Sequence, residues 1–293
     1  MTANILTLSD GGRIPAIAYG LGTSHSKNYQ EYFGTPKIDT EQVLTEVLKG
    51  GYRHVDTAEH YEKDEELAAA ISKSGIPRKE LYILSKADCN NGLTVDQALT
   101  NQLRALNVEY LDAYLIHNPR FAKTDEDLRS KWREMEAAYK SGRVKTIGVS
   151  NFTKKQIEAI LKTAEIRPTI NQFEYHPYEQ NGDLIPWLRE QKILVSAYSA
   201  LGPVTRLKPG PLGNIYSDLA RKYEVAEEDI ALKWILDQGF AVATSGLSLH
   251  RLRDYLATDT KFKLTTEEIE KIRTIGLEKK ASSFYQMGGV APN

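Results

Sequence analysis

The sequence has a single cysteine and no long apolar run. Cys89 is the lone cysteine among 293 residues, so the chain cannot close an internal disulfide, and no Cys/His cluster has zinc-finger spacing. No run of about 18 apolar residues occurs, and the N-terminus MTANILTLSDGGRIP lacks a basic segment followed by an apolar one. We therefore expect a cytoplasmic protein without membrane association.

The sequence also lacks an excess of charge of one sign. It contains 38 basic and 39 acidic residues, which gives a formal net charge of -1, and the two signs are interspersed along the chain. Proteins that bind nucleic acid gather Lys and Arg into patches that replace the counterions of the phosphates. We therefore expect no nucleic-acid partner.

Short apolar segments alternate with segments of helical periodicity. The strand-like segments are residues 17–22, 52–57, 81–86, 111–117, 144–150, 169–175, 193–199 and 240–245. Helical periodicity is clearest over residues 40–49, 94–106, 128–141, 154–164 and 230–237. Because such alternation is typical of parallel sheets and eight units close on themselves, we predict an α/β fold, a (β/α)8 TIM barrel that spans residues 1–293 as a single domain.

Three other parts of the chain have expected places around this barrel. Residues 5–8 and 13–18 flank the turn Asp10-Gly11-Gly12, which predicts an N-terminal β-hairpin cap. Residues 118–127 and 202–213 are irregular βα loops, and such loops line the C-terminal mouth of a barrel, where substrates bind. The tail SSFYQMGGVAPN has no helical pattern and is a further candidate to cover the mouth.

Four ionisable residues follow three successive predicted strands. Asp56 and Tyr61 come after the second strand, Lys86 ends the third and His117 ends the fourth. Adjacent barrel strands should bring these side chains into one cluster, in which the Lys86 ammonium, kept charged by Asp56, lowers the pKa of the Tyr61 phenol. The cluster suits carbonyl reduction without a metal, with His117 binding the carbonyl oxygen and Tyr61 donating a proton to it.

Simpler interpretations exist for each residue taken alone. Asp56 and Lys86 can form a structural ion pair, Tyr61 can be an ordinary loop aromatic, and His117 can be a polar side chain satisfied at a strand end. A metal site built from His54, Asp56 and His60 is a further alternative, but the sequence supplies too few additional ligands for it. The combination of the four residues favours the catalytic interpretation.

At these residues the sequence resembles the aldo-keto reductase family. Val55-Asp56-Thr57-Ala58-Glu59-His60-Tyr61 is similar to the family's D-T-A-x-x-Y motif, Leu84-Ser85-Lys86 to its lysine strand and Leu115-Ile116-His117 to its histidine strand. The resemblance continues through Gly20-Leu21-Gly22-Thr23, Gly148-Val149-Ser150-Asn151-Phe152, Asn171-Gln172 and Ala197-Tyr198-Ser199. It covers nearly the whole chain, and no G-x-G-x-x-G turn of a Rossmann domain is present.

The resemblance implies NADPH bound across the barrel mouth. It implies that Ser150, Asn151 and Gln172 hydrogen-bond the nicotinamide carboxamide, while Tyr198 stacks on the ring. Asp56 is included in this cofactor site. The residues expected along the ribose and the phosphates are Gly22, Thr23, Ser199, Leu201, Gly202, Ser245, Gly246 and Arg251. Ordinary alternatives are a helix cap for Ser150-Asn151, a solvated strand end for Gln172 and core packing for Tyr198.

The sequence departs from the family after the eighth strand. Ser245 occupies the position where many NADPH-dependent relatives have a lysine for the 2′-phosphate, whereas Arg251 matches the family's arginine. NADPH remains the expected cofactor, and use of NADH is a further alternative. Arg251 can alternatively be a solvated helix residue. We expect the substrate pocket to include Tyr61 and His117. Its expected wall residues are Ser24, Tyr29, Asn118, Pro119 and Tyr285.

The segments Trp132-Arg133-Glu134-Met135-Glu136 and Tyr198-Ser199-Ala200-Leu201 look similar to fungal reductases of α-keto amides and conjugated polyketones. We therefore expect a small-molecule carbonyl substrate, most simply an activated ketone, and a protein that is a monomer or a weak dimer. Two rival functions stay open. One is a cofactor-binding, redox-sensing regulatory subunit with little turnover, and the other is a metal-dependent barrel hydrolase.

Overall fold

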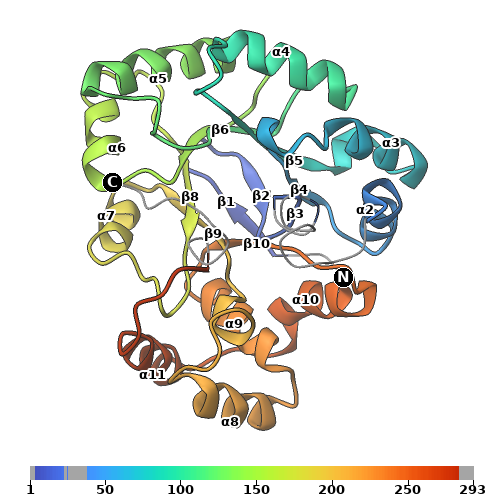
Figure 1. Ribbon diagram of the computed structural model, residues 1–293, viewed down its shortest axis with the longest axis vertical. Coiled ribbons are helices and arrows are strands. Elements are labelled where there is room, and N and C mark those ends of the chain that lie inside the picture. The colour runs from blue at the N-terminus through green and yellow to red at the C-terminus, as the bar shows by residue number, and fades with distance from the viewer. Residues whose placement is uncertain (1–3, 23–24, 26–37, 284–293) are drawn as a thin grey trace.

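Eight parallel strands form a closed barrel at the centre of the molecule. The computed structural model describes residues 4–22, 25 and 38–283. The strands are β3 (Ile17–Gly20), β4 (His54–Asp56), β5 (Tyr82–Ala87), β6 (Ala113–Ile116), β7 (Ile147–Ser150), β8 (Ile170–Glu174), β9 (Leu194–Tyr198) and β10 (Ala241–Thr244). They pair in chain order and close through β10 and β3, with the helices arranged around them (Figure 1). The predicted TIM barrel is confirmed.

Helices follow the strands along the chain. They are α2 (Thr40–Lys49), α3 (Asp64–Ser74), α4 (Val95–Leu106), α5 (Asp125–Lys140), α6 (Lys154–Leu161), α7 (Leu184–Glu190), α8 (Gly213–Tyr223), α9 (Glu227–Leu236), α10 (Leu249–Lys261) and α11 (Thr266–Gly276). Helix α5 begins three residues before the predicted segment because Thr124 forms a capping box with Asp127. In the described ranges, no helix is both long enough and apolar enough to cross a bilayer.

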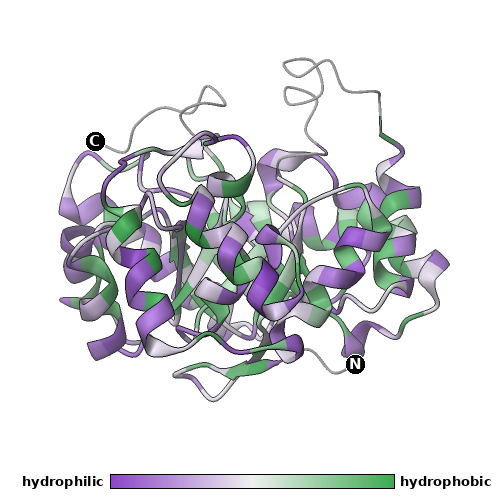
Figure 2. Cartoon of the chain, turned by 90° about the horizontal axis from the view of Figure 1, so that it is seen from below, coloured by the Kyte–Doolittle hydropathy of each residue, from purple (hydrophilic) through white to green (hydrophobic). Residues whose placement is uncertain are grey.

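The barrel strands are buried on both faces. Every residue of β4, β5, β6, β7 and β8 is buried, which explains why these segments lack the regular apolar–polar alternation of a half-exposed strand. The helices direct their apolar faces inward and their polar faces outward, as the hydropathy colours in Figure 2 show. Large aromatic side chains fill the space between, among them Trp132 of α5 and Trp234 of α9.

An antiparallel hairpin covers the N-terminal end of the barrel, as predicted. It consists of β1 (Ile5–Thr7) and β2 (Arg13–Pro15). Leu8 and Ile14 pack in one apolar cluster with residues from β5, β6 and β8. The Asp10 carboxylate accepts a hydrogen bond of 2.8 Å from the Thr146 hydroxyl, just before β7 begins. Because this end is covered, the C-terminal end is the one available for a site.

The two predicted βα loops lie at that C-terminal end. The loop after β6 ends at Thr124, where α5 is capped. The loop after β9 contains the short 3-10 helix η3 (Gly202–Val204) and ends where α8 begins at Gly213. Of the C-terminal tail, Ser282 and Ser283 are described, and both hydrogen-bond the carboxylate of Glu174 at the end of β8. The start of the tail is therefore anchored at the barrel mouth.

The barrel requires glycine at one position in β7. A Cβ atom on Gly148 would lie 2.6 Å from the carbonyl oxygen of Ile170 and 2.8 Å from a methyl carbon of Leu115. We expect Gly148→Ala to lower the free energy of unfolding by about 2 kcal/mol, because backbone of the adjacent strand must move. Gly213→Ala is the matched control, since its Cβ would meet no atom of the described part of the chain within 4 Å. Equal urea-denaturation midpoints for the two variants would contradict this explanation.

Candidate active site

Four side chains meet at the C-terminal end of the barrel. Asp56 is the last residue of β4, Lys86 lies near the end of β5 and His117 directly follows β6. Tyr61 ends the 3-10 helix η1 (Glu59–Tyr61), which begins three residues after Asp56. The register pairs Asp56 with Leu84, two residues before Lys86, and Lys86 with Leu115, two residues before His117, so all three residues lie at the C-terminal ends of adjacent strands. The structure therefore brings together all four residues of the predicted cluster.

Asp56 and Lys86 form a buried ion pair. Their side chains are 5% and 1% exposed, and the Lys86 Nζ lies 2.5 Å from Asp56 Oδ1. The ammonium also donates to the carbonyl oxygen of Thr57 at 3.0 Å, while the second carboxylate oxygen accepts a 2.6 Å hydrogen bond from Gln172 Nε2. A buried ion pair is stable only when its remaining hydrogen-bonding capacity is used, and these two contacts do so.

Tyr61 lies against this pair. The Lys86 Nζ is 5.2 Å from the centre of the Tyr61 ring, and the His117 ring meets that ring edge to face with centroids 5.6 Å apart. The other side of the phenol faces Gly22, where a Cβ atom would lie 2.7 Å from the Tyr61 hydroxyl oxygen. Gly22 thus leaves the space that the phenol occupies.

The pKa values of the site differ in one respect from the prediction. Burial raises the pKa of Tyr61 above its usual value of 10, and the Lys86 charge opposes this rise without reversing it. The predicted net lowering was therefore wrong: apolar burial outweighs the ammonium. Burial disfavours the charge of Lys86, but Asp56 and Tyr61 outweigh burial and raise the Lys86 pKa. At neutral pH the cluster holds a protonated phenol beside an ammonium.

His117 is uncharged in this environment. Burial, followed by the repulsion from Lys86, lowers the pKa of His117 to about 3. Its backbone is fixed on both sides, because its N–H donates to the Ala87 carbonyl at 3.1 Å and its carbonyl accepts from Asn151 Nδ2 at 3.0 Å. A neutral imidazole at this position can donate a hydrogen bond to a substrate oxygen without acting as an acid near neutral pH.

A second group of polar side chains lies beside the first. Asn151 follows β7 with a left-handed backbone (φ 64°) and accepts a 2.9 Å hydrogen bond from the Tyr198 hydroxyl. Its Nδ2 also donates to Ser150 Oγ at 3.0 Å, and that hydroxyl donates to the Gln172 carbonyl at 2.8 Å. The ends of β7, β8 and β9 thus present an amide- and hydroxyl-rich group next to an aromatic ring. Gln172 links this group to Asp56.

The remaining predicted cofactor residues lie on the loops after β9 and β10. Ser199, with φ 56°, opens the turn that leads into Leu201 and Gly202, and a Cβ atom on Gly202 would lie 2.4 Å from Ser283 Oγ. Ser245 and Gly246 directly follow β10, where the Gly246 carbonyl accepts a 2.8 Å hydrogen bond from the Tyr19 hydroxyl. Arg251 lies in the first turn of α10.

Two predicted wall residues of the pocket are described and three are not. Asn118 and Pro119 follow His117, and Asn118 Oδ1 accepts a 3.0 Å hydrogen bond from the Arg120 N–H. Ser24, Tyr29 and Tyr285 lie outside the described residues, as does the predicted cofactor residue Thr23.

Several contacts that fix the site were not predicted from the sequence. Glu59 of η1 accepts hydrogen bonds of 2.9 Å from the Asp88 N–H and from Asn91 Nδ2, so it ties the turn that carries Tyr61 to the loop after β5. Glu174 pairs with His176 Nε2 at 3.0 Å beside the start of the tail. Glu59 lies inside the motif that contains Tyr61, and that motif was the sequence feature that could have indicated its place near the site. No feature of the sequence indicated the partners of Glu174.

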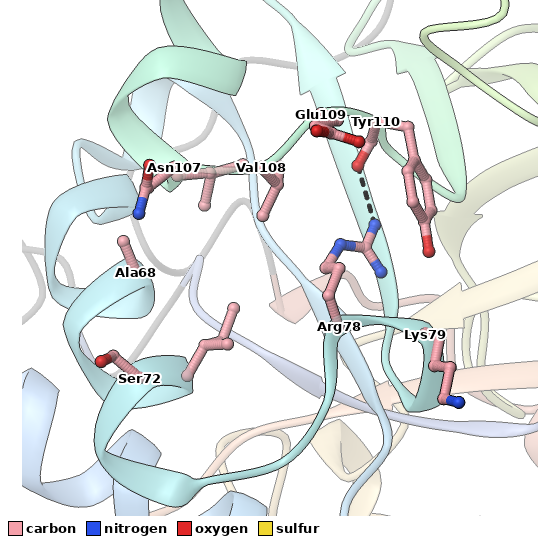
Figure 3. A pocket seen from close by; sticks show the side chains of 10 residues that line it. Ala68, Ser72, Arg78, Lys79, Asn107, Val108, Glu109 and Tyr110 are labelled. Atoms are coloured by element: carbon pink, nitrogen blue, oxygen red, sulfur yellow. Dashed lines mark hydrogen bonds between the residues drawn. The ribbon is translucent and has the colours of Figure 1, made fainter.

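A separate hollow lies at the opposite end of the barrel. It measures about 430 Å³ and is lined by α3, the 3-10 helix η2 (Arg78–Glu80) and the end of α4 (Figure 3). Arg78 is already engaged there, since it donates to the Tyr110 carbonyl at 2.8 Å and lies 2.7 Å from Asp112. Within the described residues, no group of three His, Cys, Asp or Glu side chains could hold a metal ion. The hollow therefore adds nothing to the site at the mouth.

Comparisons with known proteins match the whole barrel. The model of the "Aldo/keto reductase family" matches residues 17–276. The chain is 32% identical over 285 residues to the NAD/NADP-dependent indole-3-acetaldehyde reductase of Schizosaccharomyces pombe, with 96% of this chain and 99% of that protein covered. It is 33% identical over 290 residues to the NADPH-dependent alpha-keto amide reductase of Saccharomyces cerevisiae, with 95% and 93% covered.

A solved structure agrees with these sequence matches. The chain superposes with a TM-score of 0.83 on MGS-M4, an aldo-keto reductase from a Medee basin deep-sea metagenome library, at 28% sequence identity. The match covers 96% of this chain and 97% of that one.

The uncharged state of His117 makes stability depend on pH. The folded-state pKa of about 3 lies below the ordinary value of 6.5, so the unfolded chain binds a proton between these values that the folded chain excludes. The free energy of unfolding should therefore fall as the pH drops below 6.5, by up to about 1.4 kcal/mol per pH unit from this residue. His117→Gln should show a shallower decline in urea denaturation between pH 6.5 and 4.5. Identical slopes for the two proteins would contradict the assignment.

Proposed function

The chain belongs to the aldo/keto reductase family, and on that premise we propose that it reduces small carbonyl compounds to alcohols with NADPH, using Tyr61 as the proton donor. The observation that carries the proposal is the placement of a protonated phenol against the buried Asp56–Lys86 pair, with the neutral His117 ring alongside. Both named curated relatives are reductases whose names include a phosphorylated nicotinamide cofactor.

The residues at the barrel mouth fit a nicotinamide cofactor. A carboxamide needs both donors and acceptors, and Ser150, Asn151 and Gln172 offer hydroxyl and amide groups side by side. The Tyr198 ring, held through its hydroxyl by Asn151, offers an aromatic face at the same place. Gly22, which has no side chain, allows the Tyr61 phenol to pack directly against the backbone after β3. We assign these residues to the cofactor site together with Asp56, Ser199, Leu201, Gly202, Ser245, Gly246 and Arg251.

When bound, NADPH supplies the hydride that reduces the carbonyl carbon. The protein supplies the proton: the O–H bond of Tyr61 breaks as a new O–H bond forms on the carbonyl oxygen. Lys86 then stabilises the phenolate that remains, and Asp56 keeps the lysine charged in a buried environment that would otherwise favour its neutral form. Because burial raises the pKa of Tyr61, the phenol is fully protonated before reaction and is ready to act as an acid.

His117 has a different role from Tyr61. Its pKa of about 3 keeps the imidazole neutral, so it does not compete with Tyr61 as the acid at physiological pH. Its ring meets the Tyr61 ring at an interplanar angle of 83°, which points the two side chains toward one region of the mouth. We assign to His117 the hydrogen bond that orients the carbonyl oxygen toward the phenol.

The relatives and the loop after β6 support a proposal for the substrate class. The named relatives act on an aldehyde with an aromatic side chain and on α-keto amides. Asn118 and Pro119 stand next to His117, so this side of the pocket has a polar amide rather than an aromatic wall. We propose activated ketones, such as α-keto amides, α-keto esters or diketones, as the substrates.

Substitution of the proton donor tests the proposed reaction. Tyr61→Phe should lower kcat by about 100-fold or more, because general acid catalysis commonly contributes that factor, while the Kd for NADPH changes little. Tyr114→Phe is the matched control, since the buried Tyr114 hydroxyl has no hydrogen-bond partner among the described residues. Turnover is measured from NADPH absorbance with an α-keto ester. Near-native kcat in Tyr61→Phe would refute the role of Tyr61, and tight NADPH binding with negligible turnover in the wild type would instead favour a regulatory subunit.

A further inference from the structure

The guanidinium of Arg251 is already bound by a carboxylate of the same chain. Arg251 Nη2 lies 2.5 Å from Glu228 Oε1, and Nη1 lies 3.2 Å from Glu228 Oε2, so both ends of the fork are used. The side chains are 45% and 18% exposed. Two-pronged arginine–carboxylate contacts have the geometry that arginine also uses for phosphate, so a phosphate that takes the same edge of the guanidinium would compete with Glu228.

This pair lies where a barrel of this kind binds phosphate. The loop after the eighth barrel strand, β10, leads into α10, whose first turn contains Arg251. Ser248 caps the helix, with its hydroxyl oxygen 3.5 Å from the Arg251 backbone nitrogen. Phosphate sites in (β/α)8 barrels are frequently formed by the loops after the last two strands and a helix N-terminus. Arg251 thus brings a cation to this region, whereas Ser245 contributes no charge.

Glu228 is held in place by its own helix. It lies in the first turn of α9 with Glu227 and Asp229, where the partial positive charge of a helix N-terminus favours carboxylates. Glu227 faces a different partner, Lys208, at 2.7 Å. The negative charge of Glu228 therefore remains near Arg251 even when the ion pair itself opens.

We propose that Glu228 is a specificity-determining residue that weakens the preference for NADPH over NADH by competing with the 2′-phosphate for Arg251. This inference rests on the proposed cofactor site. A 2′-phosphate must either displace Glu228 or share Arg251 with it, and both lower the affinity for NADPH. NADH has a 2′-hydroxyl at this position, so it needs no cation there. The chain is therefore expected to use both cofactors.

Removal of the Glu228 charge tests this competition. Glu228→Gln keeps the shape of the side chain and should tighten NADPH binding about two- to fivefold, the range of one partly exposed charge contact, with the Kd for NADH unchanged. Binding of 2′,5′-ADP should tighten in the same way, whereas binding of 5′-AMP should not change. Glu227→Gln is the matched control in the same helical turn and should leave the affinities for both cofactors as in the wild type.

A double-mutant cycle separates competition for Arg251 from a general change in charge. The gain from Glu228→Gln should disappear in an Arg251→Gln background, because the contested guanidinium is gone. An unchanged NADPH-to-NADH affinity ratio in Glu228→Gln, or an equal gain in both backgrounds, would overturn the proposal. If either of these results is found while the wild-type protein binds NADPH and reduces an α-keto ester, only the role of Glu228 is refuted. If the wild-type protein binds neither cofactor, the proposed function is refuted as well.

Discussion

The ion pair between Asp56 and Lys86 is the interaction on which the rest of the site depends. Two opposite charges with 5% and 1% of their side chains exposed would be costly to bury unless every hydrogen-bonding direction were used. The barrel supplies the missing partners from different strands: the Thr57 carbonyl for the ammonium and Gln172 for the carboxylate. The pair therefore forms only when β4, β5 and β8 have closed around it. Closure of these three strands around the ion pair is therefore required both for the fold and for the chemistry of the site.

The charge of Lys86 also sets the state of its neighbours. It favours the phenolate of Tyr61, and it disfavours a proton on His117, although burial is the larger influence on both residues. The result is a division of roles between two side chains whose rings touch: the phenol keeps its proton until reaction, and the imidazole stays neutral. Gln172 extends the same network toward Ser150 and Asn151, so the proposed cofactor site and the proposed proton donor are joined through one carboxylate.

Much of the barrel and the four central residues could be predicted from the sequence. Strands buried on both faces read as apolar runs, and adjacent strand ends must lie together, so Asp56, Lys86 and His117 were placed correctly. The direction of the Tyr61 pKa could not be predicted, because it depends on how closely neighbouring side chains pack around the phenol. The Arg251–Glu228 pair joins two helices and leaves no local pattern in the sequence. The expected roles of Thr23 in the cofactor site and of Ser24, Tyr29 and Tyr285 in the substrate pocket stay predictions. The expected oligomeric state, a monomer or a weak dimer, also stays a prediction.

The most direct measurement of the central claim is the single-turnover rate of carbonyl reduction in the double variant Asp56→Asn/Lys86→Met. Removing both charges avoids a lone buried carboxylate, whose presence would cost about 3–5 kcal/mol of stability and obscure the result. We predict a folded protein that, at saturating NADPH, reduces its substrate at a rate lower by about 100-fold or more, since the phenolate would lose its stabilising cation. A folded double variant that reduces its substrate at the wild-type rate would contradict the account.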